Sequence, residues 1–387
     1  MTVQVSNNLR SDIDKWISDY VSSGKIPFGH VIICNAQDIL MNTKQGYADI
    51  NSRQPLEEKY LLRIYSMTKP MVATAFMQLL ERGMVRLEDE LTEYLPEFEE
   101  TRVFSGHGEP TPRENPITMR QLLTHSAGFT YASSEDPVAE LYTKAQIDFG
   151  QGGTLEQQCS DLAELPLLFE PGTSLNYSVS IDVLGRVIEV ISGKSLEEYM
   201  LSNILAPAGM NETAFALPQE RRKDLVTLYS NDGNEGLTTL ERGVDHLPRK
   251  CFSGGGGLIS SAADVTLFVQ TLLNRGETQS GKRLITAASL AEMTRNQLGK
   301  SFEEFGVTDI GYVPTNVAQA LTMYTVVDPK TAGMRNSVGE FGWAGSASCF
   351  FWVDPVKEFA VIFLSQQMRI GDYPHYRELN NIIYRHL

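Results

Sequence analysis

Residues 64–70 read Ile64-Tyr65-Ser66-Met67-Thr68-Lys69-Pro70 and lead into the apolar run Met71–Leu80. The run is hydrophobic almost all round, which predicts a buried helix that ends at Gly83. Ser66 and Lys69 lie about one helical turn apart, so their side chains share a face and can meet. A serine hydroxyl becomes a nucleophile when a neighbouring base takes its proton, and a desolvated lysine amine can be that base. The spacing therefore predicts a nucleophile–base pair at the start of this helix.

The Ser-x-x-Lys spacing alone is weak evidence, because it recurs at Ser22-Ser23-Gly24-Lys25. That second copy stands at the polar end of a predicted helix, whereas Ser66 follows a strand-like segment, Tyr60–Ile64, and opens a buried helix. A helix N-terminus also offers free backbone N–H groups that suit a developing oxyanion. The alternative interpretation is a helix-capping serine followed by a surface lysine, and the local sequence leaves both interpretations open.

The composition is that of an ordinary globular protein of one large domain or two to three smaller ones: 387 residues, 42% hydrophobic and 21% charged. The net charge of −15 argues against a nucleic-acid groove and against anionic membrane surfaces. No apolar run has the length of a membrane-spanning helix, and the polar segment Met1–Arg10 does not resemble a signal peptide. The four cysteines are far apart and form no Cys-x-x-Cys pair, which favours a reducing compartment. We therefore expect a cytoplasmic protein without nucleic-acid or membrane partners, and its oligomeric state stays open.

Strand-like runs gather at both ends of the chain. Near the N-terminus a helical pattern over 9–21 precedes two strands, His30–Cys34 and Ile39–Gln45, around the turn 35–38. Near the C-terminus the runs Gly342–Val353 and Phe359–Leu364 surround Asp354-Pro355, which is a hairpin signal, and a last amphipathic helix follows.

The middle of the chain is mainly helical, with helices predicted over 119–123, 179–191 and 197–205. The economical assembly is an α+β fold in which residues 1–70 and 236–387 form one antiparallel sheet flanked by helices. Residues 71–235 would then form a mainly helical domain inserted beside the sheet. The cleft between two such domains is the expected place for a site.

Other chemical signatures are missing from the sequence. The glycine run 254–257 lacks a Gly-Lys-Ser/Thr ending, so phosphate binding is not expected, and it more simply permits close packing. The six histidines form no His-x-x-x-His pair and no cluster with cysteine, which argues against a metal site. No Gly-x-Ser-x-Gly elbow is present. We therefore expect neither a metal nor another cofactor.

Five segments together resemble the serine β-lactamase and penicillin-binding superfamily, in which Ser-x-x-Lys is a catalytic motif. Their order and spacing agree over nearly the whole chain, and they are similar to the branch that holds class C β-lactamases and family VIII carboxylesterases. The resemblance implies a β-lactamase/transpeptidase-like fold. The segments are Ser66–Lys69, Leu122–Gly128, Asn176-Tyr177-Ser178, Gly254–Ser261 and Gly342–Gly345.

The resemblance also implies roles for individual residues. Ser66 corresponds to the nucleophile, and Lys69 and Tyr177 correspond to the groups that move its proton, with the formal base left open between them. The backbone N–H groups of Ser66 and Ser346 would form the oxyanion hole. Trp343, Ala344 and Gly345 would form the substrate-binding strand. Without the resemblance, the preferred interpretation of Tyr177 is a tyrosine that anchors a helix start, and packing in the core stays the alternative for Trp343.

Two departures from the family pattern bear on the substrate. The β-lactamases carry an asparagine two residues after the tyrosine, where this chain has Val179. They also carry Lys-Thr-Gly, or a close variant, where this chain has Trp343-Ala344-Gly345, similar to the esterases. The near-match Lys330–Gly333 is interrupted and receives no role.

These features predict a serine carboxylesterase that cleaves small-molecule esters through an acyl-enzyme on Ser66. A β-lactamase or D-peptidase is the first alternative, disfavoured by Val179 and by the missing Lys-Thr-Gly. An acyltransferase would use the same residues with another acceptor, so the sequence does not separate it from a hydrolase. A catalytically silent binding protein is disfavoured because Ser66, Lys69 and Tyr177 are all present.

Overall fold

The centre of the protein is an eight-stranded antiparallel sheet with strand order β10-β11-β12-β13-β14-β1-β2-β3. It is seen in a computed structural model that describes residues 4–106, 108–150, 153–231, 236–240, 250–306, 317–330 and 335–387. Both ends of the chain supply strands, because β1 pairs with β14. The strands are β1 (Phe28–Cys34), β2 (Ile39–Asp49), β3 (Gln54–Pro55), β10 (Ala318–Gln319), β11 (Tyr324–Thr325), β12 (Phe341–Gly345), β13 (Cys349–Asp354) and β14 (Phe359–Leu364).

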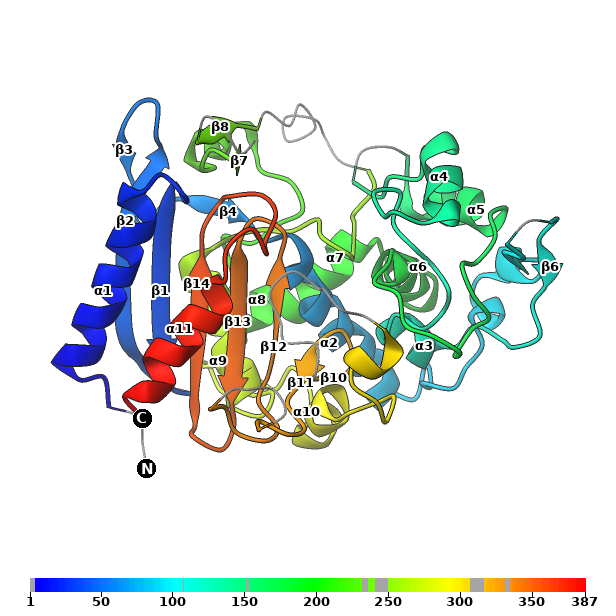
Figure 1. Cartoon of the computed structure of the whole chain (residues 1–387). Helices are drawn as coiled ribbons and strands as arrows, with labels where there is room; N and C mark the ends of the chain where they lie inside the picture. The colour runs from blue at the N-terminus through cyan, green and yellow to red at the C-terminus, as the bar shows by residue number, and fades with distance from the viewer. Residues whose placement is uncertain are drawn as a thin grey trace.

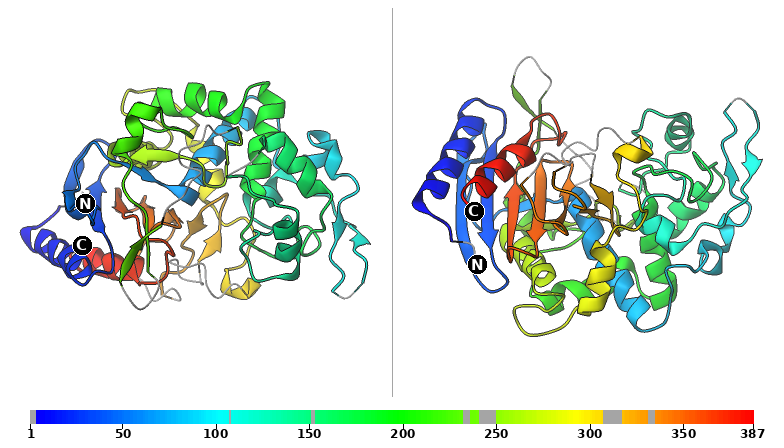
Figure 2. Two further views of the ribbon diagram at one scale, coloured as in Figure 1. Left: turned by 90° about the horizontal axis from the view of Figure 1, so that it is seen from above. Right: turned by 60° about the horizontal axis from the view of Figure 1, so that its bottom comes forward.

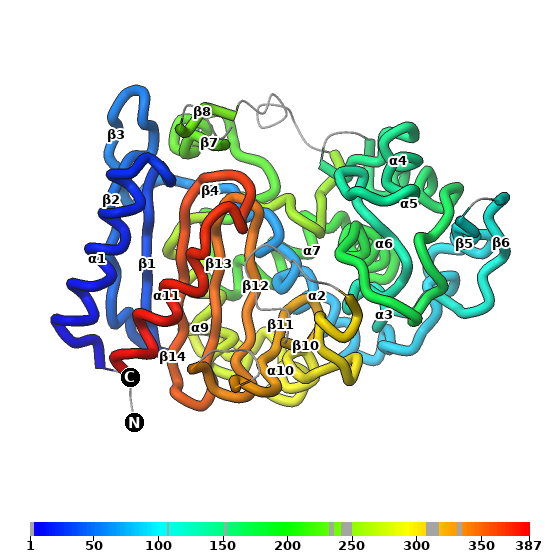
Figure 3. Tube along the Cα trace, viewed as in Figure 1, coloured from blue at the N-terminus to red at the C-terminus, as the bar shows by residue number. Residues whose placement is uncertain are grey.

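Helices cover both faces of this sheet (Figures 1 and 2). One face carries α1 (Asn7–Ser22) and α11 (His375–Arg385), the first and last helices. The Arg385 guanidinium at the end of α11 lies 2.8 Å from the carboxylate of Asp12 in α1, so the first and last helices lie side by side (Figure 3). The other face carries α9 (Ala262–Leu273), which contacts β1, β13 and β14. The apolar side chains of these helices fill the core on either side of the sheet.

The second part of the molecule is built from helices and lies beside the sheet (Figure 1). The long helix α2 (Thr68–Glu81) joins the two parts, and nearly all of its side chains are buried. It packs against α6 (Ser180–Ser192), which also contacts α3, α5 and α7. This part also holds α3 (Met119–Leu123), α4 (Pro137–Lys144), α5 (Leu155–Ala163) and α7 (Leu196–Met200), whereas α8 (Ala206–Ala208) lies behind the sheet in Figure 1 and contacts α9. None of the helices that the structure describes is both long and apolar enough to cross a bilayer.

The predicted fold class, an antiparallel sheet flanked by helices with a mainly helical part beside it, is confirmed. The predicted N-terminal hairpin and the helix 119–123 are found as predicted. The division of the chain at residues 70/71 and 235/236 stays a prediction. A small antiparallel pair, β7 (Tyr229–Asn231) and β8 (Leu237–Thr239), joins residues on both sides of the second boundary.

One predicted strand was wrong. The run Gly342–Val353 forms two strands, β12 and β13, that pair with each other around the loop 346–348. Ser348 takes the left-handed conformation there, with φ 58°, which a three-residue hairpin loop needs at its last position. The loop Ser346-Ala347-Ser348 holds no Gly, Pro, Asn or Asp, and serine is a weaker turn signal than these, so the apolar run concealed the turn.

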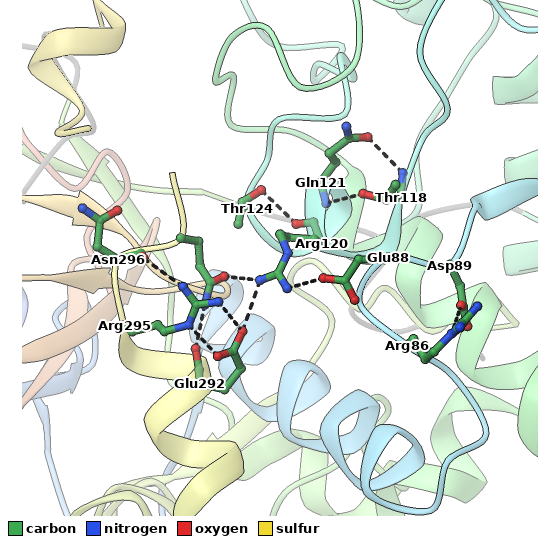
Figure 4. Close-up of polar contacts among 11 residues, drawn as sticks. Arg86, Glu88, Asp89, Thr118, Arg120, Gln121, Thr124, Glu292, Arg295 and Asn296 are labelled. Atoms are coloured by element: carbon green, nitrogen blue, oxygen red, sulfur yellow. Dashed lines mark hydrogen bonds and ion pairs between the residues drawn. The ribbon is translucent and has the colours of Figure 1, made fainter. Parts of the chain in front are cut away.

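A polar joint ties the helical part to the C-terminal part of the chain (Figure 4). Arg120 on α3 donates to the carboxylate of Glu292 on α10 (Ala287–Thr294) over 3.1 Å, and also to Gln297 and Glu88. Thr118 and Gln121 cap α3 reciprocally, which fixes its start. Because these groups are partly exposed, the joint fixes how the two parts lie against each other more than it stabilises the fold.

A buried carboxylate anchors the start of β12, the strand that runs to the functional site. Glu340 is completely buried, and it accepts hydrogen bonds from the hydroxyls of Tyr376 over 2.9 Å and Tyr384 over 2.6 Å, both on α11. Burial raises the pKa of Glu340 to about 8. Helix α11 thus holds β12 in place as well as covering the sheet.

The imidazole of His375 makes the stability of the fold depend on pH. It is buried among aromatic rings, and neither ring nitrogen has a hydrogen-bond partner among the described residues. Burial, and then the charge of Lys25, lower the pKa of His375 to about 3. As the pH falls below the ordinary histidine pKa of about 6.5, His375 binds a proton in the unfolded chain but not in the folded chain. The free energy of unfolding therefore decreases.

We expect His375→Phe to remove this part of the acid sensitivity. Between pH 7 and pH 5 the wild type should lose about 2 kcal/mol more stability than the variant. Urea unfolding of both proteins at several pH values measures this difference. Parallel stability curves over that range would contradict the assignment.

Candidate active site

Ser66 lies in a tight turn between a short strand and α2. Strand β4 (Leu61–Arg63) pairs with β9 (Ile259–Ser261), and the backbone N–H of Ile64 donates to the carbonyl of Leu258 over 3.2 Å. Tyr65 has a φ of 44°, an unfavourable conformation for a residue with a side chain, so the chain is strained just before Ser66. Ser66 itself belongs to a single 3₁₀ turn, 65–67, that leads into α2. The strained turn presents the hydroxyl at the wall of a cavity of ≈ 650 Å³.

Lys69 is completely buried, in the first turn of α2. Its Nζ donates to Ser66 Oγ over 3.1 Å and to the carbonyl of Gly255 over 2.5 Å. The same Nζ lies 4.7 Å from the ring centroid of Tyr177. A buried ammonium with two oxygen acceptors and an aromatic face is well satisfied. The alternative of a surface lysine is therefore wrong for Lys69.

Tyr177 lies in the loop before α6, on the wall of the same cavity. Aromatic rings surround it: the centroid of His125 lies 4.7 Å away, that of Tyr131 5.5 Å and that of Trp343 5.8 Å. Burial, and then the charge of Lys69, lower the pKa of His125 well below its usual value, so this imidazole is neutral. The ring of Tyr177 is thus held in a fixed aromatic setting against the Lys69 ammonium.

The end of β12 reaches the cavity next to Ser66. A Cβ on Gly345 would lie 2.2 Å from the carbonyl oxygen of Ile64, so only glycine allows the two backbones to come this close. The next residue, Ser346, lines the cavity together with Ser66. Trp343 is only 5% exposed, and it packs behind Tyr177. Direct contact of Trp343, Ala344 and Gly345 with a substrate stays a prediction.

Ser253 and Gly255–Gly257 line the same cavity, and this segment packs directly against α6. The carboxylate of Asp182 on α6 accepts from Ser253 Oγ over 2.5 Å and from the N–H of Gly255 over 2.9 Å. Burial raises the pKa of Asp182, while the Lys69 ammonium opposes that rise. The glycine run predicted close packing, and at Gly255 this packing is against the carboxylate of Asp182.

The structure brings together four of the predicted residues, Ser66, Lys69, Tyr177 and Ser346. The other Ser-x-x-Lys copy does not form such a pair, since Lys25 Nζ lies over the rings of Tyr20 and Tyr373, at 5.3 and 5.4 Å from their centroids. Of the near-match Lys330–Gly333, residues 331–333 lie outside the described residues.

Sequence reasoning missed three groups near the predicted nucleophile: Tyr131, Asp182 and the carbonyl of Gly255. Asp182 did leave a signal, because it is a charged residue within the otherwise apolar stretch 181–184. Tyr131 lies in a loop and left none. Within the part of the chain that the structure describes, no three His, Cys, Asp or Glu side chains are grouped as metal ligands.

Known proteins resemble this chain in overall sequence or in fold. Protein Rv1367c of Mycobacterium tuberculosis is 30% identical over 361 residues, which are 90% of this chain and 88% of that protein. Esterase EstB of Burkholderia gladioli is 28% identical over 356 residues, 86% of this chain and 84% of the esterase. The solved structure of EstCE1, a hydrolase with promiscuous acyltransferase activity, has a TM-score of 0.82 at 24% identity and covers 97% of this chain and 98% of its own.

The fold that the sequence predicted is the one that the solved structure of EstCE1 has. The likeness to EstCE1 extends along both chains, so the β-lactamase/transpeptidase-like fold is confirmed. The family model described as Beta-lactamase matches residues 13–382, which is nearly the whole sequence. Esterases such as EstB are among the relatives of the chain. The chain therefore belongs to the beta-lactamase family, which is a family of enzymes.

Proposed function

We propose that the protein is a serine carboxylesterase that cleaves small-molecule esters through an acyl-enzyme on Ser66. The observation that carries the proposal is that Lys69 Nζ meets Ser66 Oγ and the Tyr177 ring, and that both Ser66 and Tyr177 line a ≈ 650 Å³ cavity. The similarity to esterase EstB supports the same reaction class. A cavity of this volume is of the size that holds a small organic molecule.

In the proposed reaction, Ser66 Oγ attacks the ester carbonyl while the Lys69–Tyr177 pair takes up its proton. To accept it, the pair reacts in the form that lacks one proton, as a neutral Lys69 amine or a Tyr177 phenolate. The tetrahedral intermediate collapses, the C–O bond to the alcohol breaks, and the alcohol leaves with that proton. Water then attacks the acyl-enzyme, gives a proton to the same pair, and releases the acid as Ser66 recovers its hydrogen. Lys69 lies within hydrogen-bond distance of Ser66 Oγ, which supports a direct part in the first transfer.

The negative charge of the tetrahedral stage needs hydrogen-bond donors that are already in place. We assign this role to the backbone N–H groups of Ser66 and Ser346. Support comes from the close approach of Gly345 to Ile64, which brings the end of β12 beside the turn of Ser66. Both residues line the cavity.

Esters suit the site better than β-lactams. Val179 lines the cavity where an asparagine amide would hold a lactam side chain in the β-lactamases of the family, and valine offers no hydrogen bond there. Trp343 replaces the lysine of Lys-Thr-Gly, so this position supplies no cation for a substrate carboxylate. Both changes support an uncharged ester as the substrate.

Acyl transfer is a second candidate, because EstCE1 is a hydrolase with promiscuous acyltransferase activity. The acyl-enzyme would be the same, and an alcohol would replace water as the acceptor. Adding a short alcohol to the ester assay tests this candidate: a new ester product in place of the free acid would support it.

We expect p-nitrophenyl butyrate to be hydrolysed far faster than a chromogenic cephalosporin. Mass spectrometry of the acid-quenched protein should find the butyryl group on Ser66, with Ser66→Ala as the unlabelled control. Faster turnover of the cephalosporin would contradict the ester assignment. A butyryl group on another residue, or full activity of Ser66→Ala, would contradict the proposed nucleophile.

A further inference from the structure

Asp182 is a buried acid that the proposed reaction does not use. It lies in the first turn of α6, between Ile181 and Val183, and is 2% exposed. A buried carboxylate is costly unless it is paired or hydrogen-bonded, so its presence at this wall of the cavity calls for a reason.

The contacts of Asp182 lead to Lys69 through a single residue. Its Oδ1 accepts from the N–H of Gly255 over 2.9 Å, and the carbonyl of the same Gly255 accepts from Lys69 Nζ over 2.5 Å. Ser253 Oγ donates to the same Oδ1 over 2.5 Å, which fixes the carboxylate on its other side. The backbone of Gly255 is therefore oriented at both ends, by an acid at its N–H and by an ammonium at its carbonyl.

Packing requires a glycine at this point. A Cβ on Gly255 would lie 2.3 Å from Asp182 Oδ2, closer than any stable contact. The neighbouring Gly256 differs, since its Cβ would meet its nearest atom, in Tyr65, at 3.6 Å. The Asp182 carboxylate thus packs closely on the backbone of Gly255, and the carbonyl of this same residue accepts from Lys69.

Charge gives a second link between Asp182 and the site. The Lys69 ammonium favours the ionised form of Asp182, whereas burial and the charge of Asp148 oppose it. By reciprocity, the carboxylate favours the protonated state of groups around it. The other titratable groups on which it acts are Tyr131, in the loop after α3, and Cys159 on α5.

We propose that Asp182 is a positioning residue of the acyl-transfer site, which holds Lys69 against Ser66 through the backbone of Gly255 and balances the lysine charge. The inference rests on the proposed function of Ser66 and Lys69. It adds that the nucleophile depends on a carboxylate which touches neither the reacting atoms nor Ser66.

The test is the rate at which an alkyl fluorophosphonate labels Ser66, because labelling needs an active nucleophile but no turnover. Ser66 Oγ forms a bond to phosphorus, fluoride leaves, and the serine proton passes to the Lys69–Tyr177 pair. Asp182→Asn keeps the size and the acceptor oxygen of the side chain and removes its charge. We expect labelling and kcat to fall roughly 100-fold with little change in KM, and the acidic limb of the pH–rate profile to move to lower pH.

Asp264→Asn is the matched control. Asp264 is also a buried aspartate, 4% exposed, and it accepts from the N–H of Glu212 and the hydroxyl of Thr213, each over 2.8 Å. The substitution is chemically the same but lies on α9, away from Gly255. It should lower the melting temperature at most and leave labelling, kcat and the pH–rate profile unchanged.

The outcomes separate the possible roles. If Asp182→Asn is labelled as fast as wild type and only its melting temperature falls, Asp182 is structural and the proposal is overturned. If Asp182→Asn does not fold, Ser253→Ala serves instead, because it removes one donor and leaves the charge; a several-fold slower labelling supports the proposal, and an unchanged rate overturns it. If wild-type Ser66 is not labelled at all, the proposed function itself fails, and this inference fails with it.

Discussion

Lys69→Met will reduce the kcat of ester hydrolysis by roughly 10³-fold, whereas Lys25→Met will leave it unchanged. Both lysines follow a serine at the same spacing, but only Lys69 Nζ meets its serine, at 3.1 Å from Ser66 Oγ. Methionine has a similar length and fills the buried space, so the expected loss is that of the amine and not of packing. KM should change little, because Lys69 is completely buried and does not line the described cavity wall.

Steady-state hydrolysis of p-nitrophenyl butyrate by the three proteins measures this difference. Circular dichroism and the melting temperature show whether Lys69→Met still folds, since it leaves the Asp182 carboxylate without its nearby cation. A kcat within ten-fold of wild type in a folded Lys69→Met protein would leave Tyr177 as the group that takes the serine proton. Loss of activity in Lys25→Met would contradict the choice between the two copies.

Gly345→Ala will reduce kcat by roughly 100-fold, because the added methyl group separates the end of β12 from the turn of Ser66. Its Cβ would lie 2.2 Å from the carbonyl oxygen of Ile64, a backbone atom that cannot rotate away. Movement of β12 shifts the N–H of Ser346 relative to that of Ser66, and the proposed oxyanion hole loses its geometry. The overpacked contact should also lower the free energy of unfolding by about 1–3 kcal/mol.

Gly108→Ala is the control for this substitution. The Cβ of an alanine at position 108 would meet only Ser105 Oγ, at 3.4 Å, which is an ordinary contact. It should retain full activity. The kcat values for p-nitrophenyl butyrate, together with urea unfolding, separate the effect on the site from the effect on stability. Normal activity of Gly345→Ala would contradict the proposed place of Ser346 in the site.

Local patterns predicted the elements of the fold well. The apolar run after Ser66 became α2, and the alternation of strands and turn residues at 30–45 became the β1–β2 hairpin. Both depend on interactions between residues close in sequence. The strand break at 346–348 was missed because its conformation comes from pairing of β12 with β13 and not from turn residues.

In the predicted site, too, some contacts could be predicted from local sequence and others could not. The spacing of Ser66 and Lys69 made their contact possible, because residues one helical turn apart share a face, but Ser22 and Lys25 have the same spacing and do not form such a pair. The meeting of Lys69 with Gly255 joins residues 186 positions apart, and no local pattern encodes it. The burial of Trp343 behind Tyr177 likewise depends on how the sheet and the helical part pack together.

The sequence by itself determined the nucleophile candidate, its lysine, the order of helices and strands, and the departures at Val179 and Trp343 that favour esters. The first three follow from residue chemistry and from distances along the chain, whereas the departures at Val179 and Trp343 follow from the resemblance to the family. Only the tertiary structure decided which of two identical spacings forms a pair, and that Asp182 faces Lys69 across Gly255. The physical reason is that burial and hydrogen bonding between distant segments, which set the charge and position of a group, exist only once the segments have packed.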